Sequence, residues 1–284
     1  MRDLPATAEG RPGGPAPTPD LRTELAVLRR GAAVQLRVLG AIMLRELYTR
    51  FGRSNLGYLW LVVEPLILSL GISFTHLVVH VDLPFGFQPA SFYASGYIAY
   101  ITFRNNVNRA TSAIESNKAL MFHRQVTLAD IVIARSLLEF VAVLGAQLLV
   151  LSGFGIFGLA DWPERPYRML EGMAFLAWLS TGMAMLIAGA SELNPVVERF
   201  VHPATYLMIP LSGMFFVLDS LPGQFGALAS WFAVPQMTDM VREGLKADFH
   251  STFVNPPYLV LVCALSTLFG LLMLQIARRR MHFD

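Results

Sequence analysis

The sequence has little charge and almost no cysteine. Charged residues make up 15% of the chain, hydrophobic residues make up 54%, and the mean hydropathy is +0.50. This composition is not that of an ordinary soluble domain, and it predicts an integral membrane protein that crosses the bilayer several times. The one cysteine, Cys263, has no partner in the chain, so disulfide bonds play no part in the predicted fold.

Motifs for catalysis are also missing. The sequence contains no GxxxxGK[ST] phosphate loop, no HExxH zinc motif and no GxSxG nucleophile motif. We therefore expect no cofactor in this chain, no enzymatic activity and no nucleic-acid partner, and we expect any energy to come from another subunit. His76 and His80 could share a helix face, but no third metal ligand lies nearby, which favours polar packing over a metal site.

The N-terminal region divides into two predicted segments. Residues 1–20 hold five prolines and three glycines, which predicts a disordered cytoplasmic tail. Residues 21–53 place apolar side chains at intervals of three and four, with arginines away from that stripe. This pattern predicts an amphipathic interface helix beside anionic headgroups. The alternative is a soluble helix packed on a partner.

The remaining residues, 54–284, predict an all-α transmembrane domain with six transmembrane helices. The second apolar run is too short to cross alone, so we expect it to continue through polar residues 104–109 within protein or water. Residues 219–248 predict two short re-entrant outer helices, joined near Pro235. The six apolar runs are residues 54–79, 91–103, 131–159, 169–190, 200–218 and 257–277.

The distribution of positive charge predicts the orientation. With six crossings, 18 of the 22 Lys and Arg residues fall on the side of the two termini. Lys and Arg are enriched in cytoplasmic loops. Both termini are therefore predicted to be cytoplasmic.

Several polar side chains inside the apolar runs are candidates for lining a channel. Trp60 and Glu64 share one face of the first run, and Tyr93, Tyr97 and Tyr100 recur at i, i+4 and i+7. Aromatic rings with hydroxyl groups suit sugar rings that slide past, and a carboxylate within a membrane faces a cavity or a partner by default. The alternative for both sets is helix packing.

A family resemblance rests on the stretch RExxxRFGRSxLGYLWxxxEP, which runs from Arg45 to Pro65. The later runs FRNxVNR (103–109), NKAL (117–120) and QVT (125–127) extend it, so that it covers almost everything after residue 35. These motifs resemble the permease subunits of bacterial ABC transporters that export capsular polysaccharide.

The resemblance implies a multi-pass protein of the bacterial inner membrane that pairs with a second copy of itself. It also implies two separate ATPase subunits that hold ATP and Mg, further periplasmic or outer-membrane export components, and a lipid-linked polysaccharide as substrate. Residues 115–124 would be the coupling helix on the ATPase, with contacts from Glu115, Asn117, Lys118, Met121, Phe122, His123 and Arg124. The residues that would receive the anionic substrate are Arg45, Arg50, Arg53 and Tyr58.

Other functions stay open at this point. The same architecture could export O-antigen or teichoic acid, and the arginines could simply anchor a helix in the headgroups. A different class is a membrane-embedded acyl- or glycosyltransferase that uses Glu64, Asp130 or His123 as acid or base. That class needs a catalytic cluster, which the sequence does not show.

Overall fold

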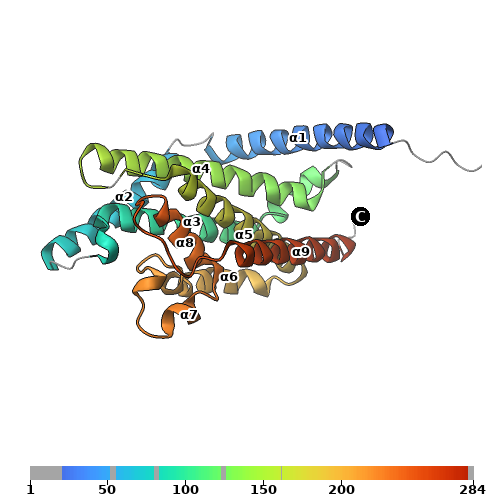
Figure 1. The fold of residues 1–284 in the computed structure, drawn as a ribbon. Coiled ribbons are helices and arrows are strands. Elements are labelled where there is room, and N and C mark those ends of the chain that lie inside the picture. The colour runs from blue at the N-terminus through green and yellow to red at the C-terminus, as the bar shows by residue number, and fades with distance from the viewer. Residues whose placement is uncertain (1–20, 52–55, 80–82, 123–125, 161, 281–284) are drawn as a thin grey trace, which may run out of the picture. The chain divides into compact units, whose positions relative to one another are not determined.

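The computed structural model describes residues 21–51, 56–79, 83–122, 126–160 and 162–280, and within these ranges every regular element is a helix (Figure 1). This confirms the predicted all-α class. The chain divides into two units, Met1–Arg37 and Val38–Asp284. In the first unit the described residues belong to helix α1 (Leu21–Phe51), and residues 25–37 are all exposed. The predicted tail, residues 1–20, lies outside the described residues.

The second unit contains the end of α1 and all later elements. They are α2 (Leu56–Val79), η1 (Pro84–Gly86), α3 (Pro89–Ala110), η2 (Glu115–Phe122), α4 (Leu128–Ile156), α5 (Pro166–Leu193), α6 (Val196–Leu207), η3 (Ile209–Leu211), η4 (Leu218–Ser220), α7 (Phe225–Ala229), α8 (Ala233–Glu243) and α9 (Pro256–Arg280), where η denotes a 3₁₀ helix.

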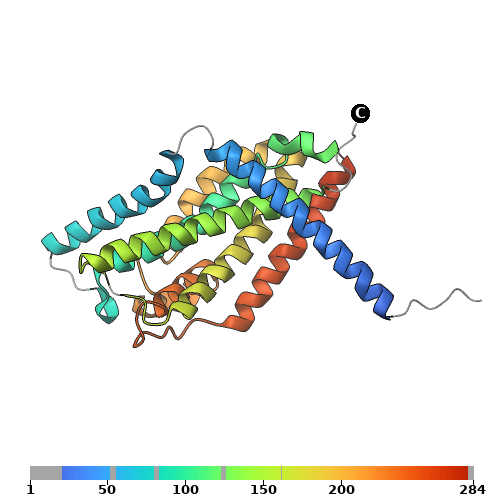
Figure 2. The same ribbon diagram turned by 90° about the horizontal axis from the view of Figure 1, so that it is seen from above.

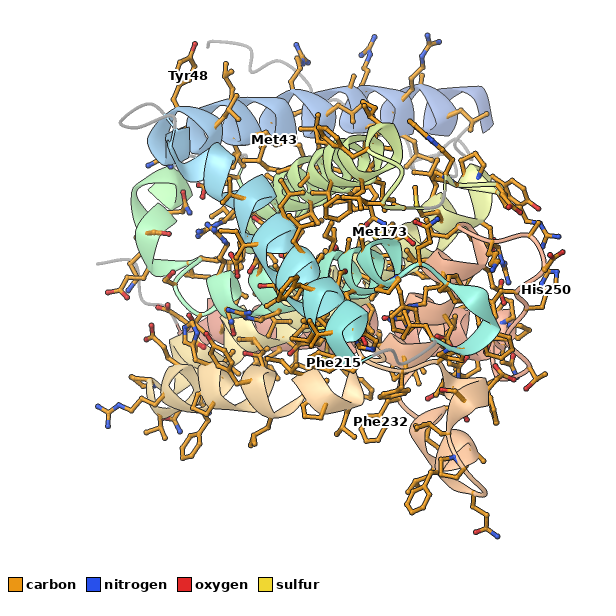
Figure 3. The ribbon with its side chains drawn as sticks, turned by 90° about the vertical axis from the view of Figure 1, so that its left-hand side faces the viewer. Met43, Tyr48, Met173, Phe215, Phe232 and His250 are labelled. Carbon is orange, nitrogen blue, oxygen red and sulfur yellow. The ribbon has the colours of Figure 1, made fainter. Side chains whose placement is uncertain are left out.

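Helices α3 and α5 form the centre of this unit. Helix α5 contacts α3, α4, α8 and α9, and α3 also contacts α2, α4 and α8 (Figure 2). Every residue of α3 from Ala90 to Phe103 is buried. Met173 on α5 is likewise fully buried, and Figure 3 shows it among the helices. A polar helix such as α3 is therefore shielded from lipid by its neighbours.

The helix starts follow from the sequence. Pro89, Pro166 and Pro256 open α3, α5 and α9, where a missing backbone N–H costs nothing. Helix α4 opens with a capping box, in which Thr127 Oγ1 accepts from the Asp130 N–H at 3.2 Å and Asp130 Oδ2 accepts from the Thr127 N–H at 2.9 Å. Asp130 is thus a capping residue at this position.

Within the described ranges, three helices, α4, α5 and α9, are long and apolar enough to cross a membrane. They correspond to the third, fourth and sixth predicted runs. Helix α2 holds a shorter apolar stretch, Leu66–His76. A membrane protein is therefore well supported, while the count of six crossings stays a prediction.

Two details of the predicted helices are wrong. The fifth run is not one continuous helix, because α6 has only 12 residues and ends at Leu207. Pro210 lacks a backbone N–H, and Gly213 takes a positive φ of 75°, which an α-helix does not allow. Pro235 does not join the two outer helices either. It lies in the first turn of α8, where proline is tolerated.

Candidate functional site

The 3₁₀ helix η2 is bonded to three other elements through polar side chains. Arg45 Nη1 on α1 donates to Asn117 Oδ1 at 2.8 Å, and Arg135 Nη1 on α4 donates to Ser116 Oγ at 3.1 Å. Lys118 Nζ lies 3.5 Å from a carboxylate oxygen of Glu192 on α5. A displacement of η2 would therefore act on α1, α4 and α5 together.

The same end of the unit carries further polar links. Arg135 Nε lies 3.2 Å from Glu46 Oε1, which joins α4 to α1. We call the side chains of these two paragraphs the η2 cluster: Arg45, Glu46, Ser116, Asn117, Lys118, Arg135 and Glu192. Figures 1 and 2 place η2 and the C-terminal end of α9, with Arg278–Arg280, at the same end of the unit.

A small cavity adjoins the η2 cluster. Its wall includes Glu139, which is 2% exposed, accepts from Asn105 Nδ2 at 3.1 Å and lies 3.6 Å from Arg109 Nε. Such a buried carboxylate requires charged or hydrogen-bonding partners. The cavity is lined by Glu46, Asn106, Arg109, Ala110, Ala113, Val132, Arg135, Glu139 and Ala184.

The three tyrosines of α3 are buried, and each hydroxyl has a partner on another helix. Tyr97 donates to Glu64 Oε1 on α2, and Tyr100 donates to the carbonyl of Thr205 on α6. Tyr93 Oη lies 3.0 Å from His76 Nε2. The structure brings Glu64 and Tyr97 together, as a shared site would require, but within one chain the three rings tie α3 to its neighbours. Their contact with a substrate stays a prediction.

His76 is a packing residue in this arrangement. Its Nδ1 lies 3.2 Å from the carbonyl oxygen of Ile72, and its ring is tilted against Tyr93 with centroids 5.1 Å apart. Across the described part of the chain, no three His, Cys, Asp or Glu side chains gather as a metal site would need. His80 lies outside the described residues.

Of the remaining predicted site residues, the structure describes the side chain of Glu115, which is exposed at the start of η2. Arg50 belongs to α1, Tyr58 and Trp60 to α2, and Met121 and Phe122 to η2, but their side chains lie outside the described ones. Arg53, His123 and Arg124 lie outside the described residues altogether.

Sequence analysis expected residues 104–109 to lie within protein or water, but it did not identify their partners. Arg104 lies over the ring of Tyr206, 4.7 Å from its centroid, and its Nη2 donates to the Tyr206 hydroxyl at 3.2 Å. Asn106 Nδ2 donates to Ser180 Oγ at 2.9 Å, while Asn106 Oδ1 accepts from Ser136 at the same distance. Glu139 lies within an apolar helix, and a carboxylate in that setting was the signal that could have identified it.

Comparison with known proteins gives a consistent result. No family model matches the chain. The chain is 32% identical over 241 residues to the capsule polysaccharide export inner-membrane protein CtrC of Neisseria meningitidis, covering 85% of this chain and 91% of the relative. It is 30% identical over 247 residues to BexB of Haemophilus influenzae, a protein of the same description, covering 87% and 93%. It is 28% identical over 253 residues to the polysialic acid transport protein KpsM of Escherichia coli, covering 86% and 94%.

Proposed function

We propose, from the premise that this chain belongs to the family of capsule polysaccharide export inner-membrane proteins, that it is the permease subunit of an ATP-driven exporter of a lipid-linked capsular polysaccharide. The observation that carries this proposal is the likeness over more than four-fifths of the chain and nine-tenths of each relative. The three apolar spans and the absence of a phosphate loop in the sequence agree with a membrane subunit that depends on a separate ATPase.

The proposed assembly has six crossings in each of two copies. Helix α2 has 24 residues and α3 has 22, so that each is at least about 33 Å long and could cross a hydrocarbon core of about 30 Å. Helix α6 and residues 208–217 would form the remaining crossing as a broken helix. Irregular backbone is tolerated at membrane depth where protein satisfies its polar groups.

The η2 cluster supports a role for η2 in coupling. A partner ATPase that moves η2 would transmit the displacement to α1 through Asn117, to α4 through Ser116 and to α5 through Lys118. Arg45 would serve twice in this scheme, because it is exposed to an anionic substrate and also bonded to η2. Substrate arrival and the position of η2 would then be linked.

A deletion strain tests the proposed function. Cells that lack this chain are expected to lose surface polysaccharide and to retain the lipid-linked polymer inside, measured by glycan analysis of surface and membrane fractions. The tagged chain is expected to carry an ATPase with a phosphate loop through purification in mild detergent. Normal surface polymer in the deletion strain would rule out the function, and the recovery of a folded chain without any ATPase would rule out the ATP-driven mechanism.

Reversing the charge of Lys118 tests the coupling role of η2. Lys118→Glu is expected to reduce co-purification of the ATPase by about tenfold, the equivalent of one contact of about 1.4 kcal/mol. Because Lys118 is 54% exposed, the folded bundle should change little. Arg199→Glu, at an exposed arginine of α6 outside the η2 cluster, is the matched control.

A double reversal separates the two ways in which Lys118 could act. Lys118→Glu with Glu192→Lys rebuilds the pair between η2 and α5 but does not restore the charge presented to the ATPase. Continued loss of the ATPase in the double variant is the result expected for direct docking. Full recovery would assign Lys118 to the internal pair alone and would contradict a docking contact.

A further inference from the structure

A second cavity lies at the opposite end of α9 from its three arginines. It has a volume of about 200 Å³ and is lined by Ser230, Trp231, Gln236, Phe253, Asn255 and Tyr258. These residues come from the turn between α7 and α8, the first turn of α8, the connection after α8 and the first turn of α9. Figure 3 shows Phe232, the neighbour of Trp231, at the edge of the unit beside α7. None of these residues belongs to the η2 cluster or to the three tyrosines of α3.

Hydrogen bonds between its walls hold this cavity in shape. Gln236 is 3% exposed, and its Nε2 donates to the carbonyl of Ser230 at 2.5 Å while its Oε1 accepts from the Asn255 N–H at 3.0 Å. The Tyr258 hydroxyl donates to the carbonyl of Trp231, also at 2.5 Å. The three connections that meet here are therefore fixed to one another before any ligand arrives.

The packing behind Phe253 also fixes its ring. A Cβ atom at Gly226 on α7 would come within 3.0 Å of Phe253 Cζ, so that α7 packs directly on the ring. The preceding residue, Thr252, donates from its N–H to Asp219 at 3.2 Å, and Ser251 Oγ donates to Asp219 Oδ2 at 2.7 Å. The Asp219 carboxylate is thus engaged in holding this segment.

The lining leaves one aromatic face and one amide donor for a ligand. Trp231 is 76% exposed. Asn255 Oδ1 accepts from the Tyr258 N–H at 3.2 Å, and its Nδ2 has no acceptor in the described part of the chain. The lining has no charged side chain, which disfavours a phosphate or a carboxylate as the recognised group.

This combination matches a sugar ring. The C–H bonds on the face of a pyranose pack against the electron-rich face of an aromatic ring, and its hydroxyl groups exchange hydrogen bonds with amides. The volume is below the range of about 300–1,000 Å³ that encloses a drug-sized ligand, which suits one sugar unit of a longer chain. We infer that this cavity is a carbohydrate subsite, with Trp231 as the stacking residue and Asn255 as the hydrogen-bond donor.

The inference rests on the proposed function, which gives the subsite a place in export. Under the predicted orientation, Arg278–Arg280 lie on the cytoplasmic side and the start of α9 lies on the outer side. The subsite would therefore contact the polymer after it has crossed the bilayer. A contact that leaves the charged groups of the polymer free binds the polymer weakly enough to let it advance.

The test uses the full-length chain in cells that depend on it for export, with the polymer of those cells as the probe. Trp231→Ala and Asn255→Asp are expected to lower surface polymer about fivefold at equal protein level, the factor that follows from losing one contact of about 1 kcal/mol. Asn255→Asp keeps the oxygen that caps α9 and replaces the amide donor with a charged carboxylate oxygen, which can only accept. Phe225→Ala, at a 65% exposed aromatic residue that does not line the cavity, should leave export unchanged.

A photocrosslinking residue tests direct contact. Trp231→benzoylphenylalanine is expected to yield, on irradiation, adducts that stain for carbohydrate, whereas Phe225→benzoylphenylalanine should not. Adducts at position 231 that contain no carbohydrate, such as adducts with bilayer lipid alone, would overturn the subsite and leave Trp231 as an aromatic anchor at the membrane surface. Normal export by Trp231→Ala would overturn it as well. The deletion strain separates the two proposals, because unchanged surface polymer there would refute the exporter itself.

Discussion

Replacing Arg242 with methionine is expected to remove most of the folded protein from the membrane fraction. Arg242 on α8 is fully buried, and its Nη1 donates to the carbonyls of Gly213 and Phe216 at 2.6 Å. Its Nη2 donates to the carbonyl of Met214 at 2.7 Å, and the guanidinium lies 3.7 Å from the centroid of the Phe92 ring on α3. The Arg242 side chain thus provides hydrogen-bond donors to the backbone carbonyls where the predicted fifth span is interrupted.

The expected loss of stability is several kcal/mol. Each buried carbonyl that is left without a donor costs about 1–3 kcal/mol, and removing one member of a buried ion pair costs about 3–5 kcal/mol. The carboxylate of Asp239, 3.6 Å from Arg242 Nη1, is the other member. Burial raises the pKa of the Asp239 carboxyl and Arg242 opposes that shift, so part of the cost would be relieved by protonation.

A double variant separates the cost of the unpaired carbonyls from the cost of the unpaired Asp239 carboxylate. Arg242→Met with Asp239→Asn removes the orphaned carboxylate, and the new amide oxygen can still accept from the Leu218 N–H that now donates to Asp239 at 3.0 Å. We expect only partial recovery of thermal stability in detergent, because the three carbonyls stay unpaired. Arg165→Gln is the control, since Arg165 pairs with His250 at an exposed position. Wild-type stability in Arg242→Met would refute this role.

Much of the fold could be predicted because it follows from local rules. The apolar runs place the starts of α3, α4, α5 and α9 within a few residues, and the prolines at helix starts and the Thr127 capping box seen in the structure agree with those starts. The break after α6 has signals in the sequence, Pro210 and Gly213, although one continuous run was predicted there. The buried position of Arg242 could not be predicted, because its partners are backbone carbonyls, which carry no sequence signal. In sequence, Arg242 is simply a charged residue of a short predicted outer helix. Only the fold shows that it is buried.

The candidate site was predictable in its parts but not in its connections. Helical spacing placed the tyrosines of α3 together, and the family resemblance placed Asn117 in a coupling segment. The bond between Arg45 and Asn117 joins residues 72 positions apart, and the bond between Tyr97 and Glu64 joins residues 33 positions apart. Such pairs depend on how α1, α2 and α3 pack, which no local pattern contains.

Replacing Gly182 with alanine is expected to destabilise the bundle even though alanine favours helix. A Cβ atom at Gly182 on α5 would lie 2.7 Å from the backbone nitrogen of Thr267 on α9. Gly270 on α9 faces the same contact, since a Cβ atom there would lie 2.5 Å from the carbonyl oxygen of Gly182. Small residues permit this close approach, which stabilises helix pairs in membranes where the hydrophobic effect does not.

The sign of the effect follows from two opposed quantities. Alanine gains about 1 kcal/mol over glycine in helix propensity, while forcing α5 and α9 apart costs about 1–3 kcal/mol at the contact and more as neighbouring contacts are lost. Gly145→Ala on α4 measures the propensity gain alone, because nothing lies within 4 Å of its added Cβ. Thermal unfolding in detergent should therefore show Gly145→Ala at or above wild type and Gly182→Ala below it. Equal gains at both positions would mean that α5 and α9 are not in close contact in the membrane.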